Sequence, residues 1–133
     1  MTHIIEIRDL LVQREKRVVL EIESLNIKRG ETLAVIGPNG SGKSTLLLVL
    51  ARLLKAERGE IRFNGQTITS RGDLTYRRRI GLVMQDALLL NRSVFDNVAT
   101  GLRFRHLPKD EVTRRVDEWL EQLGIPYPPP PEK

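Results

Sequence analysis

The feature that most constrains the fold of this chain is a glycine-rich stretch at residues 37–45. Its sequence, Gly-Pro-Asn-Gly-Ser-Gly-Lys-Ser-Thr, fits the G-x-x-x-x-G-K-[ST] pattern of a phosphate-binding loop. Glycine lets the backbone turn tightly and direct successive N–H groups at a polyphosphate. In this pattern Lys43 reaches the β- and γ-phosphates, and the hydroxyl of Ser44 is a ligand of Mg²⁺.

The residues on either side of the loop favour the strand, loop and helix that such a site requires. Residues 31–36 form a short apolar run with β-branched members, which predicts a buried strand. Residues 46–54 are apolar almost all round, which predicts a buried helix that begins near Lys43. The sequence therefore predicts that the chain binds a nucleoside triphosphate. The predicted binding residues are Gly37, Pro38, Asn39, Gly40, Ser41, Gly42, Lys43, Ser44 and Thr45.

Composition limits the remaining possibilities. A length of 133 residues corresponds to one domain at most. The chain has 22 basic and 17 acidic residues, a balance that favours anionic partners, but no aromatic platform accompanies the basic clusters, so nucleic-acid binding is not predicted. The absence of cysteine excludes disulfides and thiolate metal sites. No apolar run approaches the roughly 18 residues of a membrane span, and the N-terminus lacks a signal-peptide core.

Several further elements are predicted around the loop. Residues 3–12 and 18–28 are predicted strands, joined by a hairpin connection at residues 13–17. We expect a helix stop at Arg58 and Gly59, a strand at residues 60–63 and a hairpin turn at Asn64-Gly65. Residues 70–79 are expected to form a loop with a short helix. Residues 80–84 are predicted to be a buried strand that ends at Gln85.

The last part of the chain has a helical pattern. Ser93 is a predicted N-cap of one helix, and Pro108 is predicted to open a second helix that ends at Gly124. One apolar face is predicted for this second helix, made of Val112, Val116, Trp119, Leu120 and Leu123. Residues 126–133 are proline-rich and are predicted to be a polyproline-type tail.

Over residues 4–125 the chain resembles the N-terminal part of the ATP-binding subunit of ABC transporters, and residues 93–102 resemble a sequence that is frequent among importers. The resemblance rests on the Walker A wording of the loop, on residues 53–65, on residues 80–85 as the strand that ends in the Q-loop glutamine, and on residues 93–102 as the opening of the helical subdomain. It implies an α/β fold, an incomplete P-loop NTPase domain of the ABC type. Its expected parts are an N-terminal antiparallel β portion, a P-loop strand–helix unit and the start of the helical subdomain. Residues 1–87 would be the core, residues 88–125 the start of the helical subdomain and residues 126–133 the tail.

The resemblance also implies roles for single residues. Lys43 and the backbone of residues 40–45 would hold the phosphates of ATP, and Ser44 and Gln85 would both ligate Mg²⁺. Gln85 would also sense the γ-phosphate and link the site to the membrane subunit, and residues 88–104 would contain the surface for the coupling helix of the transporter. The implied partners are the transmembrane permease subunits and a second ATP-binding subunit. The implied location is cytoplasmic, peripheral on the inner face of the cell membrane.

The sequence departs from the family in several motifs. It has no Leu-Ser-Gly-Gly-Gln signature, no Walker B Asp-Glu pair, no D-loop and no switch histidine. Asp86 does not replace the Walker B aspartate, because Gln85 separates it from the apolar run and Ala87 follows it. Phosphoryl transfer needs a carboxylate that positions water and partner groups that complete the charge stabilisation. We therefore assign no catalytic residue and expect these 133 residues to bind ATP at most. We also expect an apolar strand edge left open beside the loop, and hence an aggregation-prone chain.

Two other functions are considered. The first is a non-catalytic module that occupies the membrane subunit of the transporter. The second is a small P-loop kinase, for which the sequence contains no acceptor motif. For the adenine base, the loop between the first two strands offers Arg14, whose guanidinium can stack on a ring. The transported solute cannot be read from these residues.

Overall fold

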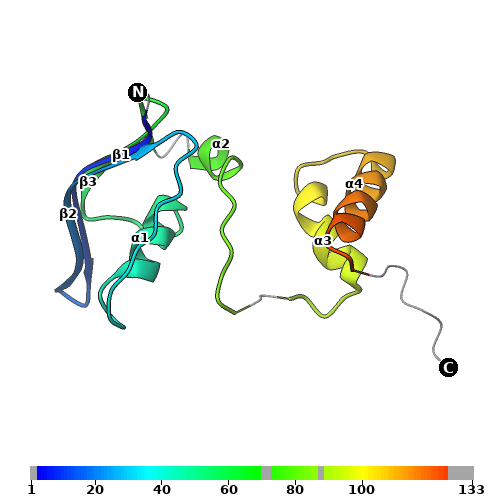
Figure 1. The fold of residues 1–133 in the computed structure, drawn as a ribbon, viewed down its shortest axis with the longest axis horizontal. Helices are drawn as coiled ribbons and strands as arrows, with labels where there is room; N and C mark the ends of the chain where they lie inside the picture. Colours follow the sequence, from blue (N-terminus) through cyan, green and yellow to red (C-terminus); the bar gives the residue numbers. More distant parts are fainter. Residues whose placement is uncertain (1–2, 70–72, 87–88, 126–133) are drawn as a thin grey trace. The chain divides into compact units, whose positions relative to one another are not determined.

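The computed structural model describes residues 3–69, 73–86 and 89–125. The chain divides into two compact units, Met1–Val83 and Met84–Lys133 (Figure 1). The first unit contains the sheet and the phosphate-binding loop, and the second contains a pair of helices. The predicted proline-rich tail at residues 126–133 lies outside the described residues.

The N-terminal hairpin forms as predicted. Strands β1 (His3–Arg14) and β2 (Arg17–Lys28) pair antiparallel along almost their full length. Glu15 and Lys16 form the two-residue turn, with φ of 49° and 62°. Positive φ at both central residues is the conformation that matches the twist of the flanking strands in a short hairpin. The alternating sequence pattern therefore gave the correct pairing partner.

Strand β3 (Arg58–Phe63) pairs antiparallel with the other edge of β1, and strand β4 (Gln66–Thr67) follows it in the order β2-β1-β3-β4. The Asn64-Gly65 turn between β3 and β4 is confirmed, with φ of 51° and 76°. The predicted helix stop at Arg58 and Gly59 is wrong, because both residues belong to β3. Gly59 is needed for close approach of β1: a Cβ there would lie 2.5 Å from the Cα of Leu10.

Helix α1 (Lys43–Leu50) packs on this sheet and is shorter than predicted. Its end is fixed by backbone hydrogen bonds: the N–H of Arg52 donates to Val49, and the N–H of Leu53 donates to Leu48. With φ of 56° at Arg52, this is the Schellman termination of a helix. The buried core of the unit joins α1 to β1 and β3 through Ile7, Leu10, Val12, Leu46, Val49 and Ile61.

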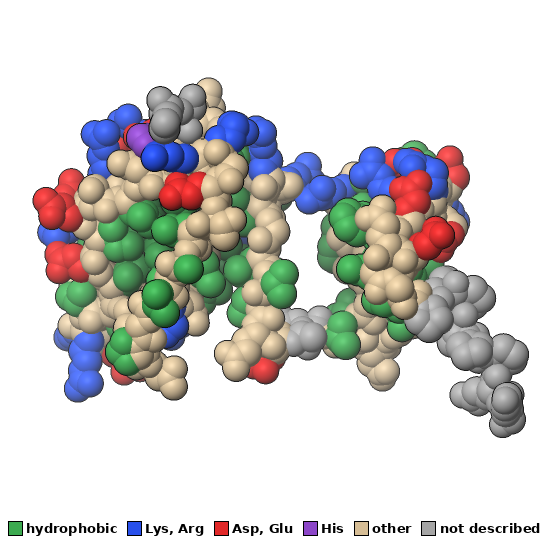
Figure 2. All heavy atoms as spheres, viewed as in Figure 1, with side chains coloured by type: hydrophobic (Ala, Val, Ile, Leu, Met, Phe, Trp, Pro, Cys, Tyr) green, Lys and Arg blue, Asp and Glu red, His purple; other side chains and the backbone are tan. Residues whose placement is uncertain are grey.

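Two predicted buried strands, at residues 31–36 and 80–84, are wrong in this structure. Neither segment is paired as a strand, and Ile36 and Val83 are each 93% exposed. A buried strand needs neighbours that satisfy its backbone N–H and C=O groups. The described strands pair only with one another, so these two segments stay extended and open. Figure 2 shows the hydrophobic side chains that reach the surface of this unit.

The short helix predicted within residues 70–79 is α2 (Asp73–Arg77). The second unit consists of helices α3 (Val94–Arg103) and α4 (Lys109–Gln122). Their shared core is Ala99, Val112, Val116 and Leu120. Trp119 and Leu123 are 57% and 67% exposed, so the predicted face of α4 is wrong at these two positions. Trp119 and Leu123 each lie three positions after a buried residue of α4, on a side of the helix that α3 does not cover.

The predicted ends of these two helices are confirmed or nearly so. The hydroxyl of Ser93 accepts a hydrogen bond from the N–H of Asp96 at 3.0 Å, as an N-cap does. Pro108 precedes α4 as its cap and is not its first residue. Gly124 ends α4 with φ of 65°. Within the described ranges, none of the helices has both the length and the apolar character needed to cross a bilayer.

Candidate nucleotide-binding site

The phosphate-binding loop depends on glycine at two positions. Gly40 and Gly42 both have φ of 82°, a conformation that only glycine adopts without strain. At Gly42 a second constraint applies, since a Cβ would lie 2.5 Å from the carbonyl oxygen of Val19. The loop is thus pressed against β2 at the residue that precedes α1, whereas Gly40 faces open space.

The side chain of Lys43 extends back across the phosphate-binding loop towards its first residues. Its ammonium donates to the carbonyl oxygens of Gly37 at 2.9 Å and Pro38 at 3.0 Å. These bonds hold a positive charge over the backbone of the loop, at the first residue of α1. A phosphate oxygen is a stronger acceptor for an ammonium group than a neutral carbonyl. The ammonium is therefore already placed where an entering anion would compete for it.

The N-terminus of α1 is suited to an anion because, in the described structure, its first turn has neither a side-chain cap nor an acidic residue. The first N–H groups of any helix have no partner within the helix, and they form the positive end of its dipole. By contrast, α3 is capped by Ser93, and α4 has the acidic residues Asp110 and Glu111 in its first turn. The first turn of α1 is left available for phosphate.

A Mg²⁺ ion would fit this loop only together with a phosphate. Ser44 is exposed in the first turn of α1, so its hydroxyl is accessible. No group of three acidic, histidine or cysteine side chains that could hold a metal occurs among the described residues. Mg²⁺ is commonly held by one or two protein oxygens with phosphate oxygens and water. The donor set here matches that mode of binding.

Gln85 is exposed and lies in the Met84–Lys133 unit, whereas the loop lies in the Met1–Val83 unit. The two predicted Mg²⁺ ligands Ser44 and Gln85 are therefore described in separate units, and their joint role remains a prediction. Arg14, considered for the adenine base, is exposed at the end of β1. One residue near α1 had no signal in the sequence. Tyr76, within the segment predicted as a polar loop with a short helix, donates from its hydroxyl to the carbonyl of Leu50 at 2.7 Å.

Comparison with known proteins identifies the family. The sequence pattern of the family described as "ABC transporter" matches residues 20–130. The chain is 38% identical over 122 residues to the spermidine/putrescine import ATP-binding protein of Mycoplasmopsis synoviae, covering 90% of this chain and 26% of that protein. It is 44% identical over 106 residues to the methionine import ATP-binding protein of Photorhabdus laumondii, covering 77% and 31%. An energy-coupling factor transporter ATP-binding protein of Streptococcus pneumoniae is 37% identical over 130 residues, covering 94% and 47%.

Solved structures agree with these sequence matches. The structure of cbiO1 from Clostridium perfringens, described as part of the ABC transporter complex cbiONQ, superposes with a TM-score of 0.78 at 35% identity. The match covers 94% of this chain and 52% of that one. A bacterial Atm1-family ABC exporter with ATP bound superposes with a TM-score of 0.68 at 29% identity, covering 75% of this chain and 18% of that one.

The chain spans between about a quarter and about a half of the length of these curated relatives. The three relatives named by function are all transporter ATP-binding proteins, and two are named for import. The family and fold expected from the sequence are therefore confirmed. The chain belongs to the ABC transporter family and corresponds to the N-terminal part of its ATP-binding subunits.

Proposed function

We propose that residues 37–45 bind the phosphates of Mg-ATP and that the chain serves as the ATP-binding component of an ABC import system. The observation that carries this proposal is the position of Lys43, whose ammonium spans the loop at the start of an uncapped helix. Backbone N–H groups, a helix N-terminus and one lysine converge on the same few residues. This combination suits a polyphosphate better than a single phosphate, because the lysine and the helix end offer separate contacts.

Different residues of this loop would bind the phosphates and the metal. The backbone of residues 40–45 and the ammonium of Lys43 would hold the phosphates, and the hydroxyl of Ser44 would ligate Mg²⁺. Gln85 would add a second Mg²⁺ ligand, as the resemblance to the family implies. The metal would neutralise charge on the phosphates. Since the sequence has no signature motif and no Walker B Asp-Glu pair, we propose that these 133 residues bind ATP without turning it over.

The partners follow from the family. We propose that the chain works with transmembrane permease subunits and with a second ATP-binding subunit, at the inner face of the cell membrane. Residues 88–125 would be the start of the helical subdomain, and the surface for a membrane subunit would lie within residues 88–104. Support comes from the relatives, two of which are named as import proteins, and from cbiO1, which is described as part of a transporter complex.

The test is Lys43→Ala, compared with Lys55→Ala. Both changes remove one lysine charge from the same unit, but Lys55 is exposed beyond the end of α1. We expect Lys43→Ala to weaken Mg-ATP binding by about 100-fold or more, since it removes a charged partner of the phosphates, while Lys55→Ala leaves the Kd unchanged. Isothermal titration calorimetry measures both constants. An unchanged Kd in Lys43→Ala would refute the site. Binding of a membrane subunit without any ATP binding would favour the non-catalytic module instead.

A further inference from the structure

The C-terminal end of α1 leaves a carbonyl group that the backbone does not reach. The N–H groups that follow the helix donate to other carbonyls: those of Leu53 and Leu54 donate to Leu48, and that of Arg52 donates to Val49. None of these N–H groups donates to the carbonyl of Leu50, which is the last residue of the helix. The hydroxyl of Tyr76 donates to that carbonyl at 2.7 Å, from 26 residues further along the chain.

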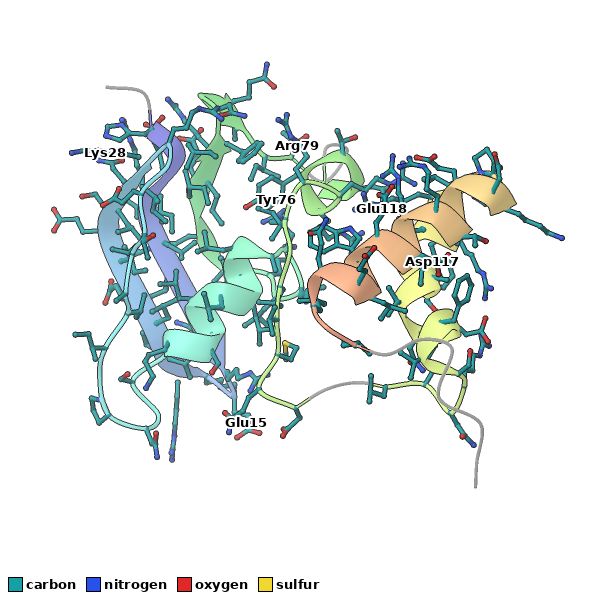
Figure 3. The ribbon with its side chains drawn as sticks, turned by 45° about the vertical axis from the view of Figure 1, so that its right-hand side comes forward. Glu15, Lys28, Tyr76, Arg79, Asp117 and Glu118 are labelled. Atoms are coloured by element: carbon teal, nitrogen blue, oxygen red, sulfur yellow. The ribbon has the colours of Figure 1, made fainter. Side chains whose placement is uncertain are left out.

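The direction of the Tyr76 hydroxyl is fixed by packing. The ring is only 5% exposed and meets the ring of Phe63 edge-on, with 5.1 Å between centroids and an interplanar angle of 74°. The guanidinium of Arg79 lies over the same Phe63 ring, 5.2 Å from its centroid. Figure 3 labels Tyr76 and Arg79 beside α2. Strand β3, helix α2 and the end of α1 are therefore joined at one buried phenol.

The phenol of Tyr76 is protonated at neutral pH and can therefore donate a hydrogen bond. Burial raises the pKa of Tyr76 above its usual range, and the nearby charge of Arg52 opposes that rise only in part. The hydroxyl thus stays protonated at neutral pH and can donate to Leu50. A buried carbonyl left without its donor costs more than the net worth of the bond when both partners are present.

We propose that Tyr76 is a positioning residue for the phosphate-binding loop, acting through the hydrogen bond that holds the C-terminal end of α1. This inference rests on the proposed function of residues 37–45. Helix α1 has eight residues, so its two ends are only about 12 Å apart. Its fully buried side chains are Leu46 and Val49, and Leu50 packs partly buried against the same core, so packing holds one side of the helix. The Tyr76 bond fixes the far end, and with it the direction in which the first turn presents its N–H groups.

The affinity of the loop for phosphates depends on the fraction of molecules in which α1 has the orientation that the Tyr76 hydrogen bond holds. The apparent Kd of a site rises in proportion as its competent state becomes less populated. Removing one buried hydrogen bond shifts such an equilibrium by about fivefold. Tyr76→Phe removes the hydroxyl and keeps the ring against Phe63. We therefore expect it to weaken the binding of Mg-ATP and of inorganic tripolyphosphate by the same factor, up to about five, because the change acts on the phosphate loop and not on the base.

The experiment measures both Kd values by calorimetry for the unaltered chain, Tyr76→Phe and the control Thr67→Val. Thr67 also loses one side-chain hydrogen bond, to Glu60, in the same unit, and that bond joins β4 to β3 without involving α1. We expect the control to leave both constants unchanged. If Tyr76→Phe lowers the melting temperature but leaves both Kd values at those of the unaltered chain, Tyr76 is merely structural and the proposal is wrong. If the unaltered chain binds neither ligand, the proposed function itself fails.

Hydrogen exchange on the unaltered chain tests the inference without any substitution. Tripolyphosphate should slow exchange at residues 43–46 and also at residues 52–54, where the backbone bonds of the helix end lie. In Tyr76→Phe the slowing should persist at residues 43–46 and be lost at residues 52–54. Slowing confined to the loop in the unaltered chain would mean that the two ends of α1 are not coupled, which overturns the proposal.

Discussion

Two regions of this chain have similar β-forming sequences and opposite outcomes. Strands β1, β2 and β3 form a sheet in which Ile7, Leu10 and Val12 are almost completely buried. Residues 31–36 and 80–84 are equally apolar and β-branched, yet they form no strand and expose Ile36 and Val83. The difference is the backbone partner. The first region finds its antiparallel neighbours within the chain, whereas the described strands offer no pairing to the second. A strand is therefore a property of a pair and not of one segment.

The largest expected effect uses two isoleucines that differ in burial. Ile7→Ala should lower the free energy of unfolding by about 2–5 kcal/mol, because the side chain is fully buried in the core that the sheet shares with α1 and its removal leaves a cavity. Ile36→Ala should change it by less than about 0.5 kcal/mol, as for exposed positions in general. Urea unfolding followed by circular dichroism measures both.

A cost of about 2 kcal/mol or more for Ile36→Ala would break the comparison. It would mean that residues 31–36 are buried in solution, in a strand or against a second copy of the chain. Sedimentation velocity separates these two cases, because only the second gives a larger particle whose size falls with dilution.

Helix α4 also contains one buried and one exposed residue of the same type, and we expect a smaller difference in the free energy of unfolding between their alanine variants. Leu120 is 2% exposed and Leu123 is 67% exposed, on the same helix α4. Leu120→Ala should lower the free energy of unfolding of the helical unit by about 2–4 kcal/mol. This is in the lower part of the usual range for buried leucine, because the core that Leu120 shares has four buried residues in the described part of the unit. Leu123→Ala should be nearly neutral. Fluorescence of Trp119, the only tryptophan, reports the unfolding of this unit. Equal costs for the two changes would show that Leu123 is covered in solution.

The smallest expected effect concerns the capped N-terminus of α3, which differs from the uncapped N-terminus of α1. Ser93→Ala should cost about 1 kcal/mol, the usual worth of an N-cap. The hydrogen bond from Ser93, followed by that from Arg103, holds the pKa of Asp96 below its usual range. A lowered carboxyl pKa adds stability at neutral pH that is lost as the pH falls through the folded-state value.

The pH dependence sharpens this last prediction. The helical unit should lose stability below about pH 4, and Ser93→Ala should lose less of it on acidification, because the variant no longer holds the pKa of Asp96 as low. Urea unfolding at pH 7 and pH 3, followed by Trp119 fluorescence, measures the difference. Ser24→Ala, an exposed serine of β2, is the control and should be neutral. An unchanged pH profile in Ser93→Ala would mean that Asp96 gains nothing from the cap.

Local chemistry made much of this molecule predictable. The hairpin at residues 13–17, the Asn64-Gly65 turn, the Ser93 cap and the Gly124 helix end each depend on residues a few positions apart, and each was confirmed. The glycine pattern of residues 37–45 likewise predicted a loop that begins a helix, and the structure has Gly42 in the left-handed conformation before α1. The pattern of the loop and the later segments together also identified the family.

Tertiary structure alone decided what depends on distant partners. No local pattern could show that residues 31–36 and 80–84 lack pairing, or that Trp119 and Leu123 lie outside the core of α3 and α4. The contact of Tyr76 with Leu50 spans 26 residues and leaves no periodic trace in the sequence. Glycine turns and helix caps are fixed by backbone sterics and hydrogen bonds within one turn. Burial and strand pairing are fixed only when another segment supplies the opposing surface.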